Sequence, residues 1–187
     1  MRTTTFSTGY FQLHPDVSMN FQMSRWFNGV GEADMLDEMR RIANYADWKR
    51  EFLTLADSAA ARGQTLRAGF YFRSAEFFMR PDDPDRKKAR SSFLAAFRSV
   101  YALDPNDQFQ VPYSDGVLSG VLPAYRFTPV PSKGTFVFFG GFDSYIEELV
   151  VAFLYLHDQG YEVIAALLHK SASGRVFPSV EQSHPTR

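Results

Sequence analysis

The segment Thr135-Phe136-Val137-Phe138-Phe139-Gly140-Gly141-Phe142-Asp143-Ser144, followed by Glu147-Glu148, decides the fold of this chain. An apolar run that stops at two glycines and restarts with helical spacing predicts a strand, a tight turn and a helix. Glycines let a ligand approach the backbone, and the N–H groups of such a turn can stabilise a developing negative charge. The turn at Gly140, Gly141 and Phe142 is therefore a candidate oxyanion hole. An ordinary connection between a strand and a helix is the competing interpretation.

The sequence around this turn predicts a parallel crossover. A strand over 135–139, a helix from Ser144 to about Gln159 and an apolar strand over 161–165 form a βαβ unit. Ser144 and Glu147 fit a capping box at the start of the helix. The continuous apolar character of both strands is typical of parallel strands that are covered on both faces. We therefore expect an α/β fold in this part of the chain.

Two further regions precede the crossover. Residues 109–112 and 117–127, separated by the turn Ser114-Asp115-Gly116, predict a β-hairpin. Upstream of about residue 104, apolar side chains recur at helical spacing, with Gly63 suited to a left-handed helix end. The expected organisation is a flexible N-terminus over 1–9, a helical domain over 10–104, a partial α/β core over 105–168 and an irregular tail over 169–187.

Composition excludes several classes of function. Twenty basic residues against 21 acidic ones give a net charge of -1, so neither nucleic acid nor an anionic membrane finds a basic surface. The absence of cysteine excludes disulfides, thiolate zinc sites and a cysteine nucleophile. No apolar run reaches the roughly 18 residues of a membrane span, and residues 1–9 lack a signal-peptide core. No pair of histidines has metal-ligand spacing. We expect a cytoplasmic protein without a metal or cofactor.

The hairpin and the segment from Phe136 to Glu148 together resemble the opening of an α/β-hydrolase domain. More narrowly, they resemble the subgroup with a helical N-terminal cap, which includes dihydroxypseudooxynicotine hydrolase and FrsA-like esterases. The helical stretch Arg73-Ser74-Ala75-Glu76-Phe77-Phe78 is similar to that cap. The resemblance implies a serine hydrolase, of esterase or carbon–carbon-bond-cleaving type, that acts on a small-molecule ester or ketone. It also implies that the N–H of Phe142 is one oxyanion donor, the second following the nucleophile.

The chain departs from this family after the second parallel strand. It contains no Gly-x-Ser-x-Gly nucleophile elbow, and Ala166-Leu167-Leu168-His169-Lys170 stands where the family has a glycine-rich loop. The residues after Ala165 are too few for a further strand and helix, a catalytic acid and a catalytic histidine. We therefore expect a chain truncated before the nucleophile elbow, without a Ser/acid/His triad and inactive by itself.

Three residues of the helical region are candidates for lining a pocket beneath the cap. They are two aromatic residues of the early segment, Phe21 and Trp26, and Glu76 on an aromatic-rich helix. Core packing is the commoner use of such aromatic side chains. For Glu76, a solvated helix position is the commoner interpretation.

Two alternatives to a hydrolase portion remain open at this point. The amphipathic helices could form a protein-interaction module that binds a peptide, in the manner of tetratricopeptide repeats. The chain could also be a truncated partner that docks onto a full-length homologue. In the α/β-hydrolase strand order, residues 135–139 border the missing nucleophile strand, and this predicts an open apolar edge and self-association.

Overall fold

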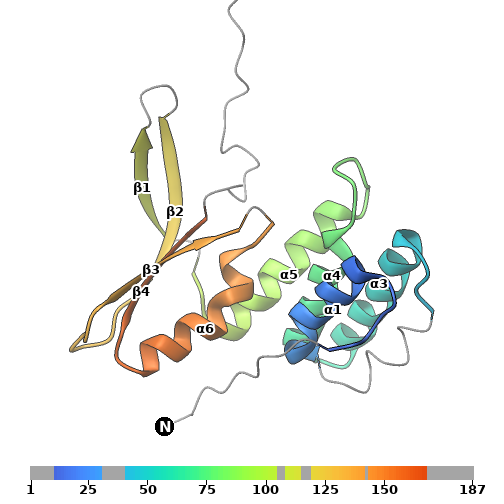
Figure 1. The fold of residues 1–187 in the computed structure, drawn as a ribbon, viewed down its shortest axis with the longest axis horizontal. Coiled ribbons are helices and arrows are strands. Elements are labelled where there is room, and N and C mark those ends of the chain that lie inside the picture. Colours follow the sequence, from blue (N-terminus) through green and yellow to red (C-terminus); the bar gives the residue numbers. More distant parts are fainter. Residues whose placement is uncertain (1–10, 31–40, 105–107, 115–118, 142, 168–187) are drawn as a thin grey trace, which may run out of the picture. The chain divides into compact units, whose positions relative to one another are not determined.

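The computed structural model describes residues 11–30, 41–104, 108–114, 119–141 and 143–167 (Figure 1). The chain divides into two compact units, with the boundary between Leu103 and Asp104. The described part of the first unit is helical. The second unit contains a sheet of four strands and one described helix.

The helical unit is built around one central helix. Its described helices are α1 (Val17–Val30), α3 (Tyr45–Ala61), α4 (Thr65–Phe77) and α5 (Arg86–Tyr101). Helix α4 packs against each of the other three, so every residue from Ala68 to Glu76 is buried. Aromatic rings fill the spaces between the helices, with Phe70 of α4 meeting Phe97 of α5 at 4.8 Å between ring centroids. Burial on all sides explains why α4 has no polar face.

Local sequence signals set the ends of α3. The Asn44 side-chain oxygen accepts hydrogen bonds from the N–H groups of Ala46, at 2.9 Å, and Asp47, at 3.0 Å. This satisfies two of the amides that a helix N-terminus leaves without partners. At the other end, Gly63 has φ of 69°, as the sequence predicted for a left-handed helix end.

Gly69 allows α4 and α5 to approach closely. A Cβ atom at this position would lie 2.9 Å from Cβ of Ala96 and 3.1 Å from the ring of Phe97. We expect Gly69→Ala to destabilise the protein by about 1–3 kcal/mol, because overpacking outweighs the gain of about 1 kcal/mol in helix propensity. Urea denaturation followed by circular dichroism measures this difference. Ser91→Ala, at an exposed position of α5, is the control and should change stability by less than about 0.5 kcal/mol.

The second unit is a mixed sheet, which confirms the predicted fold class. Its elements are β1 (Phe109–Ser114), β2 (Ser119–Phe127), β3 (Thr135–Gly140), α6 (Ile146–Asp158) and β4 (Glu162–Leu167). The strand order is β1-β2-β4-β3. Strand β2 pairs antiparallel with both β1 and β4, whereas β3 pairs parallel with β4. The hairpin and the parallel βαβ crossover therefore form where the sequence predicted them.

Helix α6 covers one face of this sheet. Phe153 of α6 contacts Phe127 of β2 at 6.1 Å and Phe138 of β3 at 5.1 Å between ring centroids. Side chains alternate between the two faces of a strand, so Val137 and Phe139 project from the opposite face. Their exposed fractions are 58% and 53%.

The expectation that 135–139 is covered on both faces is therefore wrong for this chain. Strand β3 lies at the edge of the sheet, and its large apolar side chains are 39–58% exposed. Among the described residues, no strand pairs with its outer side. An apolar sequence can predict that a strand needs cover, but it does not supply the covering element.

Candidate functional site

The glycine turn lies at the C-terminal end of β3. Gly140 is the last residue of the strand, and Gly141 follows it directly; Phe142 lies outside the described residues. The N–H of Ser144 donates to the carbonyl of Gly141 at 3.1 Å, which closes the turn before α6. The predicted donor, the N–H of Phe142, is thus not described, and the other two residues of the turn, Gly140 and Gly141, lie between a parallel strand and a helix N-terminus.

The backbone conformation at position 141 does not require a glycine. The φ angle of Gly141 lies outside the positive range that favours glycine. A Cβ atom at this position would lie 3.5 Å from side-chain oxygens of Asp143 and Ser144, which is an ordinary contact distance. Gly141 is also exposed. The fold would therefore accept a larger residue at position 141. A glycine there leaves the backbone open to close approach by a ligand.

The start of α6 is acidic. The helix begins at Ile146, and the N–H of Tyr145 donates to Oε1 of Glu148 at 3.2 Å. The predicted capping box of Ser144 and Glu147 is therefore wrong by one residue, because the helix starts later than the sequence pattern indicated. Glu147 and Glu148 are both buried in the first helical turn, where they offset the positive end of the helix dipole. An anion bound at the start of α6 would therefore have to be stabilised by the N–H groups of the glycine turn.

The three predicted pocket residues lie in the helical unit and do not form one group. Phe21 of α1 is 53% exposed, whereas Trp26 and Glu76 are each 2% exposed. Trp26 and Glu76 meet through Arg73 of α4. The Arg73 guanidinium lies 5.2 Å from the centre of the Trp26 ring, and its Nη1 donates to Oε2 of Glu76 at 2.8 Å.

Glu76 is the buried centre of an ion-pair cluster, which we call the Glu76 hub and define as Glu76, Arg73, Arg86 and Arg90; Glu76 and Arg73 are buried, whereas Arg86 and Arg90 are partly exposed. Its Oε1 accepts from Nε of Arg86 at 3.1 Å and from Nη2 of Arg90 at 2.6 Å. The solvated interpretation of Glu76 is wrong. Burial raises the pKa of Glu76, but the surrounding guanidinium groups, Arg73 first, outweigh burial and hold that pKa below its usual value.

A second carboxylate organises the sheet. Glu162, at the start of β4, accepts from the hydroxyls of Thr135 at 2.6 Å and Thr128 at 2.9 Å, and from Arg126 at 2.6 Å. These bonds, the one from Thr135 first, lower the pKa of Glu162. The cluster joins β2, β3 and β4, together with Thr128 just after β2. Thr135 begins β3 and the glycine turn ends it, so Glu162 lies at the opposite end of the strand from the candidate oxyanion hole.

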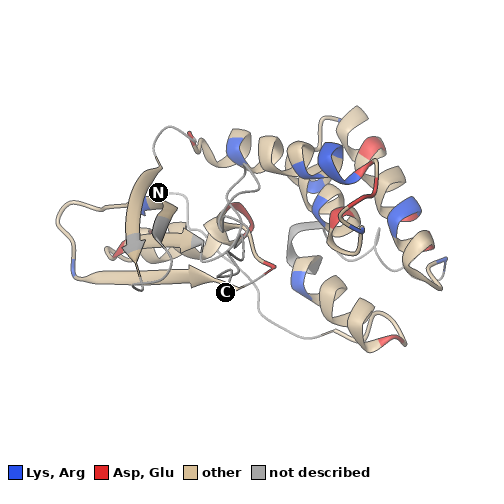
Figure 2. Ribbon diagram, turned by 90° about the horizontal axis from the view of Figure 1, so that it is seen from above, with Lys and Arg blue, Asp and Glu red and all other residues tan. Residues whose placement is uncertain are grey.

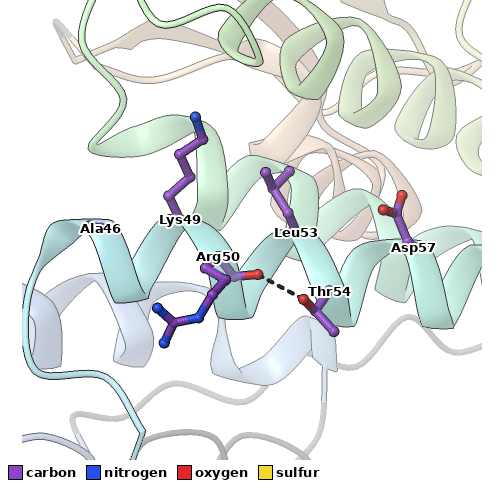
Figure 3. Close-up of a pocket in the computed structure, with 6 residues that line it drawn as sticks. All are labelled: Ala46, Lys49, Arg50, Leu53, Thr54 and Asp57. Atoms are coloured by element: carbon purple, nitrogen blue, oxygen red, sulfur yellow. Dashed lines mark hydrogen bonds between the residues drawn. The ribbon is translucent and has the colours of Figure 1, made fainter.

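A depression along α3 has no catalytic set of side chains. Figure 3 shows its lining, which comes from one face of the helix: Ala46, Lys49, Arg50, Leu53, Thr54 and Asp57. The two cations in it are already paired, Lys49 with Asp83 at 2.7 Å and Arg50 with Asp47 at 2.7 Å. The hydroxyl of Thr54 donates to the carbonyl of Arg50 at 2.9 Å. This depression is therefore best explained as a solvated face of α3.

The described part of the chain offers neither a metal site nor a membrane-spanning helix. Within it, no three histidine or carboxylate side chains gather in a way that could hold a metal ion. No helix in these ranges has both the length and the apolar character needed to cross a membrane.

Comparisons with known proteins give one curated relative and several solved structures. The chain is 34% identical over 116 residues to Hydrolase acrC from Aspergillus aculeatus, which covers 53% of this chain and 27% of the relative. The structure of AbyA5 matches with a TM-score of 0.55 and 18% identity, over 79% of this chain and 44% of AbyA5. A structure of 2,6-dihydroxy-pseudo-oxynicotine hydrolase aligns with a TM-score of 0.40 and 20% identity, over 76% of this chain and 44% of the other. No family model matches the sequence.

The likeness is partial in length. The chain spans about a quarter of the curated relative and less than half of each of these two solved structures. The match to AbyA5 concerns the fold, and the match to the curated hydrolase concerns the sequence. The chain therefore shares a stretch of sequence with a curated hydrolase and part of its fold with AbyA5.

Proposed function

We propose that this chain is the cap and the first strands of a cytoplasmic α/β-hydrolase-type serine hydrolase, with a small-molecule ester or ketone as the substrate of the whole enzyme. The observation that carries the proposal is the order β1-β2-β4-β3 with a glycine turn at the end of the parallel strand β3. In this assignment residues 10–104 are the cap and 105–168 the partial core. The turn at Gly140, Gly141 and Phe142 supplies one oxyanion donor.

We propose further that this chain alone catalyses no serine-dependent hydrolysis. Its sequence has no Gly-x-Ser-x-Gly, and one oxyanion donor without a nucleophile leaves the reaction without its covalent step. Purified chain should neither react with a fluorophosphonate probe nor turn over p-nitrophenyl acetate faster than the same chain after heat denaturation. Stoichiometric labelling of one serine in the native chain, absent after denaturation, would contradict this proposal.

Trp26 and Glu76 have different roles in this proposal. Trp26 lines the substrate pocket beneath the cap, whereas Glu76 supports that wall through Arg73, which contacts both residues. Phe21, exposed on α1, offers its ring to the substrate or to the missing part of the enzyme.

We also propose that a second copy of the chain covers the open edge of β3 when the rest of a hydrolase sheet is absent. Among the described residues no strand pairs with the outer side of β3, and β3 carries no charged residue that would oppose pairing. Figure 2 shows that charged residues gather in the helical unit and are sparse on the sheet. The parallel pairing of β3 with β4 has no place in a purely helical interaction module, so we do not propose that alternative.

A further inference from the structure

His14 is a buried histidine whose two ring nitrogens have different kinds of partner. The residue lies in the segment before α1 and is 6% exposed. Its Nδ1 lies 2.9 Å from the backbone nitrogen of Asp16, and its Nε2 lies 2.9 Å from the carbonyl oxygen of Ile42. A backbone N–H can only donate and a carbonyl can only accept, so Nδ1 is the acceptor and Nε2 carries the proton. The surroundings of the ring therefore select one neutral tautomer.

The segment that carries His14 is held against α1 by the side chain of Asn20. Oδ1 of Asn20 accepts from the N–H groups of Leu13 at 2.6 Å and His14 at 2.9 Å. Nδ2 of Asn20 donates to the carbonyl of Phe11 at 2.9 Å. The contact between His14 and Ile42 is different in kind, because it spans 28 positions in the sequence and reaches the chain just before α3. His14 thus ties together two segments of the helical unit that are distant in sequence.

A second proton on the ring would oppose these contacts. An imidazolium donates from both nitrogens, so Nδ1–H of His14 would face the N–H of Asp16, which offers no acceptor. That hydrogen bond would be lost, and a charge would be buried with it. Histidine side chains change their charge between about pH 8 and about pH 5. The contacts are therefore complete at the upper end of this range and are lost as the pH falls through it.

No acidic side chain pairs with the ring in the described part of the chain. The charged residues of the segments around it are Asp16, Arg25 of α1, Arg41 and Asp47. The Asp16 carboxylate accepts from a backbone N–H in the first turn of α1 at 2.9 Å, and Asp47 pairs with an arginine of α3 at 2.7 Å. Both nitrogens of His14 meet backbone groups. An imidazolium here would thus lack the carboxylate partner that favours the charged form.

We propose that His14 is a pH-sensitive clasp between the segment before α1 and Ile42. The clasp is closed when the ring is neutral with its proton on Nε2. It opens when Nδ1 gains a proton, and residues 11–16 are then released from Ile42. The clasp includes no residue of the glycine turn or of the proposed substrate pocket, so it goes beyond the proposed function and does not depend on it.

Amide hydrogen exchange of the full chain, read from ¹⁵N–¹H spectra, tests the clasp. The protection factor compares each amide with an unfolded chain at the same pH, so it removes the intrinsic effect of pH on exchange. We expect the protection factors of Leu13, His14 and Asp16 to fall at least about fivefold between about pH 7.5 and about pH 5. The amide of Ala68, which donates to the carbonyl of Gln64 at 2.9 Å, is the internal control and should keep its protection.

A variant and a second spectrum separate His14 from other titrating groups. His14→Gln places an amide N–H near the position of Nε2 and gains no proton in this range, so its protection factors should change less than about twofold. In the unsubstituted chain, long-range ¹H–¹⁵N spectra of the His14 ring should show the proton on Nε2 at about pH 7.5. This spectrum tests the clasp even if the variant does not fold.

Four results would each overturn the proposal. The first is a His14 ring that carries its proton on Nδ1 at neutral pH. The second is protection of residues 13–16 that does not change with pH in the unsubstituted chain. The third is a His14→Gln chain that loses this protection to the same extent, which would assign the effect to another group. The fourth is an equal fall at Ala68, which would mean that the whole helical unit opens in acid.

Discussion

Replacing Glu76 with alanine is expected to lower the free energy of unfolding of the helical unit by about 3–5 kcal/mol, the usual cost of removing one partner from a buried ion pair. The substitution leaves the Arg73 guanidinium, whose side chain is 2% exposed, without the carboxylate that now lies 2.8 Å away. It also removes the acceptor of Arg86 and Arg90, which joins α5 to α4. The midpoint of urea denaturation, followed by circular dichroism, measures the loss.

An exposed ion pair is the matched control. Asp82 contacts Arg80 at 3.2 Å, and both side chains are at least 75% exposed. Asp82→Ala should therefore change stability by less than about 1 kcal/mol. A loss for Glu76→Ala that is no larger than that of the control would mean that the Glu76 hub is not a stabilising contact between α4 and α5.

The same carboxylate predicts a dependence of stability on pH. The pKa of Glu76 is lower in the folded chain than in the unfolded chain, where it is about 4.3. Its contribution is thus complete above that unfolded pKa and is lost as the pH falls through the folded pKa. Between neutral and acidic pH, Glu76→Gln should lose less stability than the unsubstituted chain does. Other carboxylates with lowered pKa, such as Asp83, are common to both chains and cancel in this difference.

Sequence patterns could predict the elements of this fold because the signals are local. Period-two and helical spacing, with glycine at the ends, located the hairpin, β3 and α6 within a few residues. The Glu76 hub was missed because Arg86 and Arg90 lie ten and fourteen residues away and reach Glu76 through the packing of α5 on α4. The spacing of Arg73 and Glu76 by three positions was the one local sign of it.

The candidate sites show the same division. The glycine turn was visible in the sequence, since its chemistry lies in consecutive backbone groups. Exposure of β3 depended on which strands the chain supplies, and the hydrolase strand order anticipated this better than the apolar character of the strand.

Placing a lysine on β3 is expected to weaken association between copies of this chain strongly. Val137 is 58% exposed on the face of the sheet away from α6, in a strand without charged residues. When two copies pair through the same edge, symmetry brings equivalent residues of the two strands near each other. Val137→Lys therefore sets two like charges close together and should weaken association by at least about tenfold.

Sedimentation equilibrium over a concentration series separates the outcomes. The unsubstituted chain should show a mass above its 21.3 kDa that rises with concentration, and Val137→Lys should stay closer to 21.3 kDa at each concentration. Val130→Lys adds the same charge at a residue that is 94% exposed outside the strands, so it controls for net charge and should associate like the unsubstituted chain. If both lysine variants associate as the unsubstituted chain does, copies meet elsewhere than β3; if the unsubstituted chain is monomeric throughout, its open edge tolerates water and does not recruit a second copy.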